Sequence, residues 1–162
     1  MTILGKFLTL LILLSTSYAF AQQNKKVFDL DNKRDTLYLE KTGLLDDYPN
    51  CRLEQEDSIA FDKYNKAFRL VSGKLHGYIS QQNFDFRTKD STVVLMHKFH
   101  VNTKGEIDYC TFIARSDLSK RTTRRYAKLL EEFIEGRKVN YESETQFFIC
   151  GHSRFWSRPD LR

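Results

Sequence analysis

The sequence predicts one α+β domain, a small antiparallel sheet with two helices packed on one face. Three observations predict it. Residues 61–78 carry apolar side chains at helical spacing, residues 92–114 form two strands around a turn, and a second amphipathic helix precedes an apolar closing segment at 145–155. The expected order is therefore a β-β-α-β core preceded by a helix.

Length and composition agree with one compact domain. The 162 residues are 41% apolar and 14% aromatic, with only 7 Gly and 2 Pro, which excludes a collagen-like or broadly disordered chain. Lys and Arg number 26 against 21 Asp and Glu, a formal net charge of +5. A nucleic-acid binder of this size usually concentrates more charge than this, so we expect no nucleic-acid partner.

Residues 1–21 have the pattern of a secretory signal peptide. Lys6 provides a positive start, residues 7–14 are apolar, and Ala19-Phe20-Ala21 is a small-x-small cleavage site. The apolar run is shorter than the roughly 20 residues of a membrane span. We expect an exported protein, periplasmic or secreted, with no transmembrane span after cleavage. The alternative is an uncleaved N-terminal anchor.

Residues 22–50 are expected to form an N-terminal arm ahead of the domain at 51–162. The segment 36–39 alternates, with Leu37 and Leu39 on one face, which predicts a strand. Residues 27–30 are either a short strand or a frayed arm. The polar residues between the two segments are compatible with a hairpin turn.

Six aromatic and aliphatic residues predict the first long helix, because they follow one another at steps of three and four positions. They are Phe61, Tyr64, Phe68, Val71, Leu75 and Tyr78. We expect this stripe to face the core. Gly73 and Gly77 weaken the last turns, so the helix is expected to end near Ser72 or to bend there.

The strongest strand is predicted at 92–101, where apolar residues on both faces indicate a central position in the sheet. Asn102–Gly105 has turn chemistry, including a glycine that can take a positive φ. A returning strand follows at 107–114. The second helix has its apolar stripe at 126–133 and is expected to stop at Gly136.

A hairpin signature joins these two strands: Phe99-x-Val101-Asn102-x-x-Gly105-x-Ile107. Together with the second helix and the closing strand, the stretch 93–155 resembles the C-terminal domain of the TonB family, in particular its shorter exported members. The resemblance implies a small antiparallel sheet with helices on one side and the binding of extended peptide segments. The chain departs from the family pattern at 137–141, where Pro is missing. We see neither the anchoring helix nor the Pro-rich spacer, so energy transduction to an outer-membrane transporter is not expected.

A right-handed crossover puts the closing strand parallel to the second core strand, so that it can lie beside the first, on the side away from the second. Cys110 and Cys150 then lie two strands apart, roughly 9.6 Å. A disulfide needs Cα atoms within about 7 Å. Any bridge would therefore include Cys51.

His97 and His100 form an H-x-x-H pattern on the first core strand. Residues three apart on a strand point to opposite faces, so one metal ion cannot bind both. We expect neither a metal site nor a cofactor, and interpret the two imidazoles as buried or edge groups with a hydrogen bond each.

Cys150 and His152 share a face of the closing strand, the proximity that a thiolate–imidazole pair needs. No orienting Asn or Asp lies near them, and the sequence has no Gly-x-Ser-x-Gly motif or Gly-rich phosphate loop. We therefore favour a structural cysteine and a protein that is not an enzyme, and keep a thiol-dependent enzyme as an alternative.

A basic cluster occupies the first turns of the second helix. Its members are Lys120, Arg121, Arg124, Arg125 and Lys128. The N-terminal end of a helix is already positive, so these cations repel one another and the helix dipole. One hypothesis is a patch for an anionic partner, such as an acidic peptide, a lipid headgroup or a cell-wall carboxylate. The alternative is a solvated helix face.

The closing strand is expected to have one free edge, to which an extended peptide can add by backbone pairing. The candidate binding residues are Gln146, Phe148, His152 and Arg154. The alternative is an edge covered by the segment 36–40 or by a second copy of the chain.

Together these features predict an exported envelope binding module that recognises a protein or extended peptide. The expected partner is a protein or peptide of the cell envelope, an outer-membrane protein being one candidate, and a homodimer is compatible with the sequence. An exported inhibitor or immunity protein is the main alternative, since such proteins are also small and poor in motifs.

Overall fold

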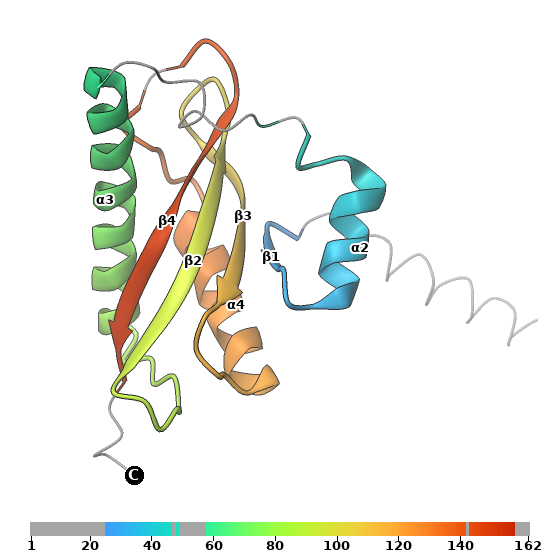
Figure 1. The fold of residues 1–162 in the computed structure, drawn as a ribbon, viewed down its shortest axis with the longest axis vertical. Helices are drawn as coiled ribbons and strands as arrows, with labels where there is room; N and C mark the ends of the chain where they lie inside the picture. The colour runs from blue at the N-terminus through green and yellow to red at the C-terminus, as the bar shows by residue number, and fades with distance from the viewer. Residues whose placement is uncertain (1–24, 47, 49–57, 142, 158–162) are drawn as a thin grey trace, which may run out of the picture.

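The computed structural model describes residues 25–46, 48, 58–141 and 143–157. Over these residues the chain forms a four-stranded sheet in the order β1-β3-β2-β4 and three helices, which confirms the predicted α+β class (Figure 1). The elements are β1 (Val27–Asp29), α2 (Lys33–Thr42), α3 (Ser58–Gln81), β2 (Thr92–Val101), β3 (Ile107–Ala114), α4 (Lys120–Ile134) and β4 (Phe147–Trp156). The predicted signal segment, 1–21, lies outside the described residues.

The core of the sheet has the predicted strand order. β2 is central and pairs antiparallel with β3 on one side and with β4 on the other. The crossover through α4 brings β4 back beside β2, so β4 runs parallel to β3 with β2 between them. The turn between β2 and β3 also follows the prediction, since Gly105 has a φ of 76°.

The N-terminal arm corrects two predictions. β1 pairs parallel with β3, so the sheet is mixed and not purely antiparallel. The predicted strand at 36–39 and its hairpin are wrong, because these residues lie inside α2. The Asn32 side chain caps the helix by accepting the N–H of Arg34, and Gly43 ends it with a φ of 63°.

The first long helix, α3, is longer than expected. Its buried positions are Tyr64, Ala67, Val71, Leu75 and Ile79. The helix continues through both glycines to Gln81, so the predicted end near Ser72 is wrong. The last turns persist because Leu75 and Ile79 are buried against the core, and this packing outweighs the cost of about 1 kcal/mol for each glycine.

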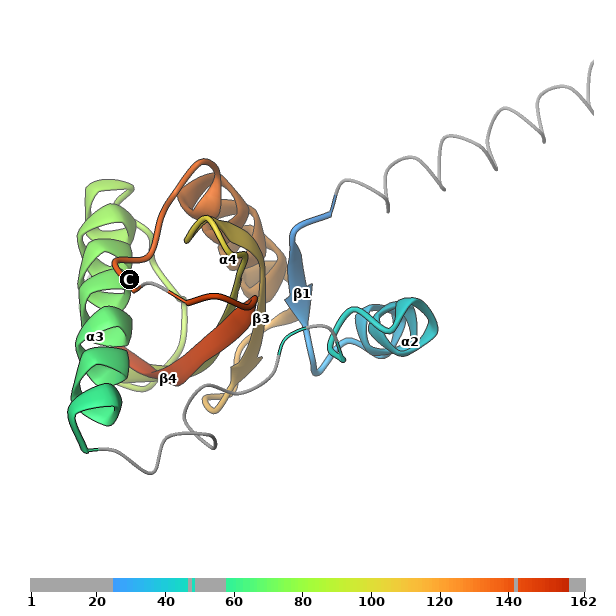
Figure 2. The same ribbon diagram turned by 90° about the horizontal axis from the view of Figure 1, so that it is seen from above.

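The sheet separates a large core from a small one. The large core lies between the sheet and the pair α3 and α4, which cover the same face (Figure 2). The small core lies on the other face, where α2 covers β1 and part of β3. It consists of Phe28, Leu39, Tyr48 and Tyr109. Among the described helices, none is long and apolar enough to cross a membrane.

Candidate functional site

The outer edge of β4 is one of the two edges of the sheet, and β1 forms the other. β4 pairs with β2 along its whole length, and no described residue pairs with it as a strand on the other side. The predicted alternative, that segment 36–40 covers this edge, is wrong, because α2 lies beside β1 at the opposite end of the sheet. The described part of the chain therefore leaves the outer edge of β4 without a strand partner.

The backbone of β4 shows which groups face outward. The N–H of Cys150 donates to the hydroxyl of Tyr64 on α3 at 2.7 Å, although Cys150 is paired in register with Lys98 on β2. In an antiparallel ladder, residues that face the partner alternate with residues that face away. The N–H and C=O groups of His152 and Arg154 therefore also face away from β2.

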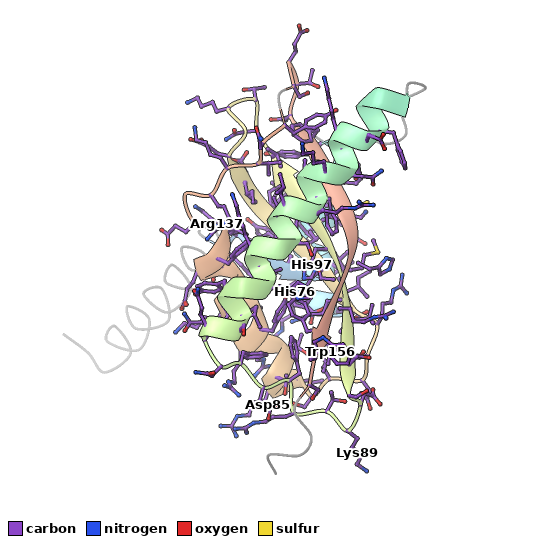
Figure 3. The ribbon with its side chains drawn as sticks, turned by 90° about the vertical axis from the view of Figure 1, so that its left-hand side faces the viewer. His76, Asp85, Lys89, His97, Arg137 and Trp156 are labelled. Carbon is purple, nitrogen blue, oxygen red and sulfur yellow. The ribbon has the colours of Figure 1, made fainter. Side chains whose placement is uncertain are left out.

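Helix α3 runs along β4 in step with it. One turn of a helix rises about 5.4 Å and two residues of a strand about 6.6 Å, so successive turns of α3 can contact successive residues of β4. The contacts are Tyr64 with Cys150, the Phe68 ring in the space that a Gly151 Cβ would take, the hydroxyls of Ser72 and Ser153 at 2.9 Å, and the rings of His76 and Phe155 at 4.3 Å. Figure 3 views this side and shows His76, Trp156 and Asp85 in its lower half, towards the C-terminal end of α3.

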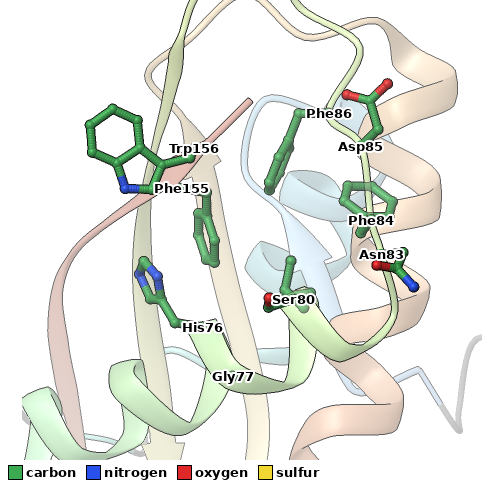
Figure 4. A pocket seen from close by; sticks show the side chains of 10 residues that line it. His76, Gly77, Ser80, Asn83, Phe84, Asp85, Phe86, Phe155 and Trp156 are labelled. Atoms are coloured by element: carbon green, nitrogen blue, oxygen red, sulfur yellow. The ribbon is translucent and has the colours of Figure 1, made fainter. Parts of the chain in front are cut away.

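A pocket of about 740 Å³ opens where α3 and β4 part (Figure 4). It is lined by His76, Gly77, Ile79, Ser80, Asn83, Phe84, Asp85, Phe86, Phe155 and Trp156. Phe86 and Phe155 are buried and lie 5.3 Å apart, so the floor is aromatic. Trp156, the only tryptophan of the chain, is 77% exposed at the rim.

The segment between α3 and β2 holds two of these aromatic rings in place. Asn83 has a φ of 49° and ends α3 in the left-handed conformation that asparagine tolerates. Arg87 has a φ of 53°, which is unfavourable for an arginine, and its N–H donates to the Asp85 carboxylate at 2.9 Å. Between these two residues, Phe84 and Phe86 pack edge to face at 4.9 Å.

The pocket has one titratable ring in its wall. Burial lowers the pKa of His76, so this imidazole is neutral at pH 7 and stacks on Phe155 at an interplanar angle of 12°. The guanidinium of Arg125 lies 5.1 Å from the centroid of Phe84. The pocket therefore combines an aromatic floor, a neutral imidazole and a cation at its outer side.

Of the four predicted edge residues, two are displayed on β4 and two are not. His152 and Arg154 are exposed on β4. Phe148 is half-buried and packs against His100 in the small core, so it is not displayed at the edge. Gln146 precedes the strand. The pocket was not identified from the sequence. Two features of the sequence indicated it: the Phe84-x-Phe86 pair and Trp156 at the end of the closing strand.

The basic cluster is exposed on α4. All five of its side chains, Lys120, Arg121, Arg124, Arg125 and Lys128, are open to solvent. Ser119 caps the helix through the N–H of Thr122. Arg125 connects this cluster to the pocket through its contact with Phe84.

The predicted cysteine geometry is confirmed. Cys110 is fully buried towards the helices, whereas Cys150 is half-buried on β4, and β2 runs between them. Both are free thiols, and Cys51 lies outside the described residues. The sulfur of Cys150 accepts a hydrogen bond from Tyr64 at 3.6 Å, and His152 lies on the same face of the strand, as predicted.

The two strand histidines also point to opposite faces. His97 lies in the large core, 2.7 Å from the Tyr126 hydroxyl, and His100 stacks on Tyr109 at 4.0 Å in the small core. Burial lowers the pKa of each to about 3. The described residues contain no group of three side chains suited to a metal ion.

Comparison with known proteins adds no relative. No protein-family model, no curated protein and no solved structure matches the chain. The resemblance of residues 93–155 to the TonB C-terminal domain therefore stays a prediction.

Proposed function

We propose that this chain is an exported binding module of the bacterial cell envelope that takes up an extended peptide segment by strand addition to the outer edge of β4. The observation that carries the proposal is the outward-facing backbone of His152 and Arg154, which no described strand pairs. An extended peptide adds to such an edge through main-chain hydrogen bonds.

The length of edge available is limited. Tyr64 already accepts the Cys150 N–H, so a peptide cannot form a continuous ladder past that residue. The segment from His152 to Trp156 is the part of β4 that lies beyond it. The site therefore takes a short extended segment, and side-chain contacts must add to the few backbone hydrogen bonds.

The charges near this edge favour an acidic partner. Arg154 lies on the edge itself, and the basic cluster of α4 reaches the pocket through Arg125. The chain as a whole has a net charge of +5. Such a field raises the rate of association with an anionic peptide and makes binding sensitive to salt.

A proline substitution tests the strand addition. Arg154→Pro removes an outward N–H, and proline is tolerated on a strand edge when its missing N–H faces solvent. Arg154→Ala is the matched control, since it removes the side chain but keeps the N–H. The probe is a peptide selected on the full chain from a displayed library of short random sequences. We expect the peptide to protect the amides of His152 and Arg154 from hydrogen exchange.

We expect Arg154→Pro to abolish binding of this peptide, and Arg154→Ala to keep most of it. Both variants should unfold at a similar denaturant concentration, because neither loses a ladder hydrogen bond to β2. Equal peptide affinity in the proline variant and the wild type would show that strand addition at this edge is wrong.

A further inference from the structure

We infer that the pocket at the end of β4 is a specificity subsite for one aromatic side chain of the added peptide. This inference rests on the proposed strand addition, because it assigns to the pocket a residue of the same peptide. The pocket volume of about 740 Å³ lies in the range of about 300–1,000 Å³ in which proteins bind ligands.

The position of the pocket follows from the course of α3. A strand added outside β4 turns alternate side chains towards the helices. Beside Gly151 and Ser153 that space is filled by Phe68 and Ser72 of α3. Along the part of β4 beyond Cys150 and over the described residues, space opens beside Phe155, where α3 approaches its end. The geometry therefore admits one inward side chain, at the position next to Phe155.

The chemistry of the floor selects an aromatic group. Phe84, Phe86 and Phe155 already pack at 4.9 and 5.3 Å in edge-to-face and tilted contacts. A further ring extends this arrangement, and aromatic pairs gain stability beyond the area they bury. The rim carries Ser80, Asn83 and Asp85, which suit a polar tip such as a tyrosine hydroxyl.

Two further observations indicate a binding site. Trp156 is 77% exposed at the rim, and tryptophan is enriched among the residues that contribute most to binding at interfaces. Arg87 keeps a left-handed backbone at the end of the segment that presents Phe84 and Phe86. Strained backbone of this kind clusters at ligand-binding sites.

The experiment uses the single tryptophan as its reporter. N-acetyl-tyrosinamide and N-acetyl-phenylalaninamide are titrated into the full chain, with N-acetyl-alaninamide as the apolar control. We expect the two aromatic amides to shift the emission of Trp156 to shorter wavelength in a saturable manner, because they shield its ring from water. The alanine compound should have no such effect.

Two matched variants locate the effect. Ser80→Phe places a ring in the pocket, whereas Gln81→Phe adds the same ring at the next residue, which does not line the pocket. We expect Ser80→Phe to weaken binding of the aromatic amides and of the selected peptide by about tenfold or more. Gln81→Phe should bind both as the wild type does.

The outcomes separate this inference from the proposed function. If Ser80→Phe binds the selected peptide as tightly as the wild type, the pocket is not a subsite, and strand addition stands. If Arg154→Pro keeps the peptide while Ser80→Phe loses it, strand addition is wrong and the aromatic site stands by itself. Aromatic amides that leave the Trp156 emission unchanged overturn the inference.

Discussion

The hydroxyl of Tyr64 on α3 accepts the backbone N–H of Cys150 on β4 at 2.7 Å, so a helix side chain takes the place of a strand partner in the middle of a sheet edge. The same hydroxyl donates to the Cys150 sulfur at 3.6 Å. Exposed strand edges invite uncontrolled pairing between chains, and proteins protect them by covering part of the edge. Tyr64 protects one half of β4 in this way and leaves the other half open.

Tyr64→Phe should release this protection. We expect the Cys150 amide to exchange faster with solvent and the free energy of unfolding to fall by about 0.5–1.5 kcal/mol, the usual net value of one hydrogen bond. Amide exchange followed by NMR measures the first effect and urea unfolding the second. Tyr78→Phe is the control, because its hydroxyl donates to exposed Glu132 on α4 at 3.0 Å and not to β4. Unchanged exchange at Cys150 would contradict the role of Tyr64.

Gly151 is required by the close approach of α3. A Cβ at this position would clash with the Phe68 ring, so Gly151→Ala must displace that ring. We expect a loss of about 1–3 kcal/mol in the free energy of unfolding. Gly73→Ala, where a Cβ meets nothing within 4 Å, should instead stabilise α3 by about 0.5–1 kcal/mol. Denaturant unfolding that ranks the two variants in the opposite order would refute this packing.

The two described thiols should differ sharply in reactivity. Cys110 is fully buried, and burial raises the pKa of its thiol well above the usual range, whereas Cys150 is half-buried. Iodoacetamide should therefore modify Cys150 in the folded chain and Cys110 only after unfolding in urea. Mass spectrometry of the digested protein measures both. Recovery of a peptide that joins Cys110 to Cys150 under non-reducing conditions would overturn the strand order.

The buried histidines predict a loss of stability in acid. Burial, assisted by the charge of Lys98, lowers the pKa of His100 to about 3, below its ordinary value of 6.5. Below pH 6.5 the unfolded chain therefore binds a proton that the folded chain does not. As the pH is lowered through this range, this group decreases the free energy of unfolding by about 1.4 kcal/mol per pH unit, until the pH nears its folded pKa. Above pH 6.5 both states are neutral at this position and the dependence disappears.

His100→Phe should reduce that slope. Among the described residues, neither ring nitrogen of His100 has a hydrogen-bond partner, so phenylalanine removes two buried polar atoms and keeps the stacking on Tyr109. We expect stability near pH 7 to stay equal or to rise. Urea unfolding at several values between about pH 7.5 and about pH 5 measures the slope. Phe148→Leu, which disturbs the same cluster without removing a titrating group, should keep the slope of the wild type.

The basic cluster should cost stability at low salt. Arg124 lies four residues from both Lys120 and Lys128 on α4, and like charges at this spacing destabilise a helix by about 0.2–0.5 kcal/mol per pair. Arg124→Gln should therefore stabilise the chain by about 0.4–1 kcal/mol at low salt and by much less at high salt. Thermal unfolding at two salt concentrations tests this. A destabilised variant would show that Arg124 makes a favourable contact instead.

Much of the fold could be predicted from local patterns. The alternation in β2 and the turn at Gly105 identified the central hairpin, and the β-β-α-β order with a crossover connection allowed β4 to lie beside β2, as it does. The segment 36–39 was misassigned because four alternating residues are too few to distinguish a strand from a helix. Leu37 is 44% exposed and Leu39 is 1% exposed, the difference that a helix produces and a strand does not.

The site could be predicted only in part. The open edge followed from the strand order, and His152 and Arg154 are exposed on it. Phe148 was assigned to the same edge, since alternation shows which face a side chain takes but not what covers that face. The small core covers it, and its members come from distant parts of the chain.

The sequence by itself determined the periodic faces of the helices, the hairpin and the order of the core strands, because each depends on local spacing or on chain handedness. Only the tertiary structure decided that Tyr64 closes the edge at Cys150 and that His76, Phe86 and Phe155 meet in one pocket. Such contacts depend on how α3 lies along β4. Local periodicity indicates which side chains face inward, and long-range packing decides which of them meet.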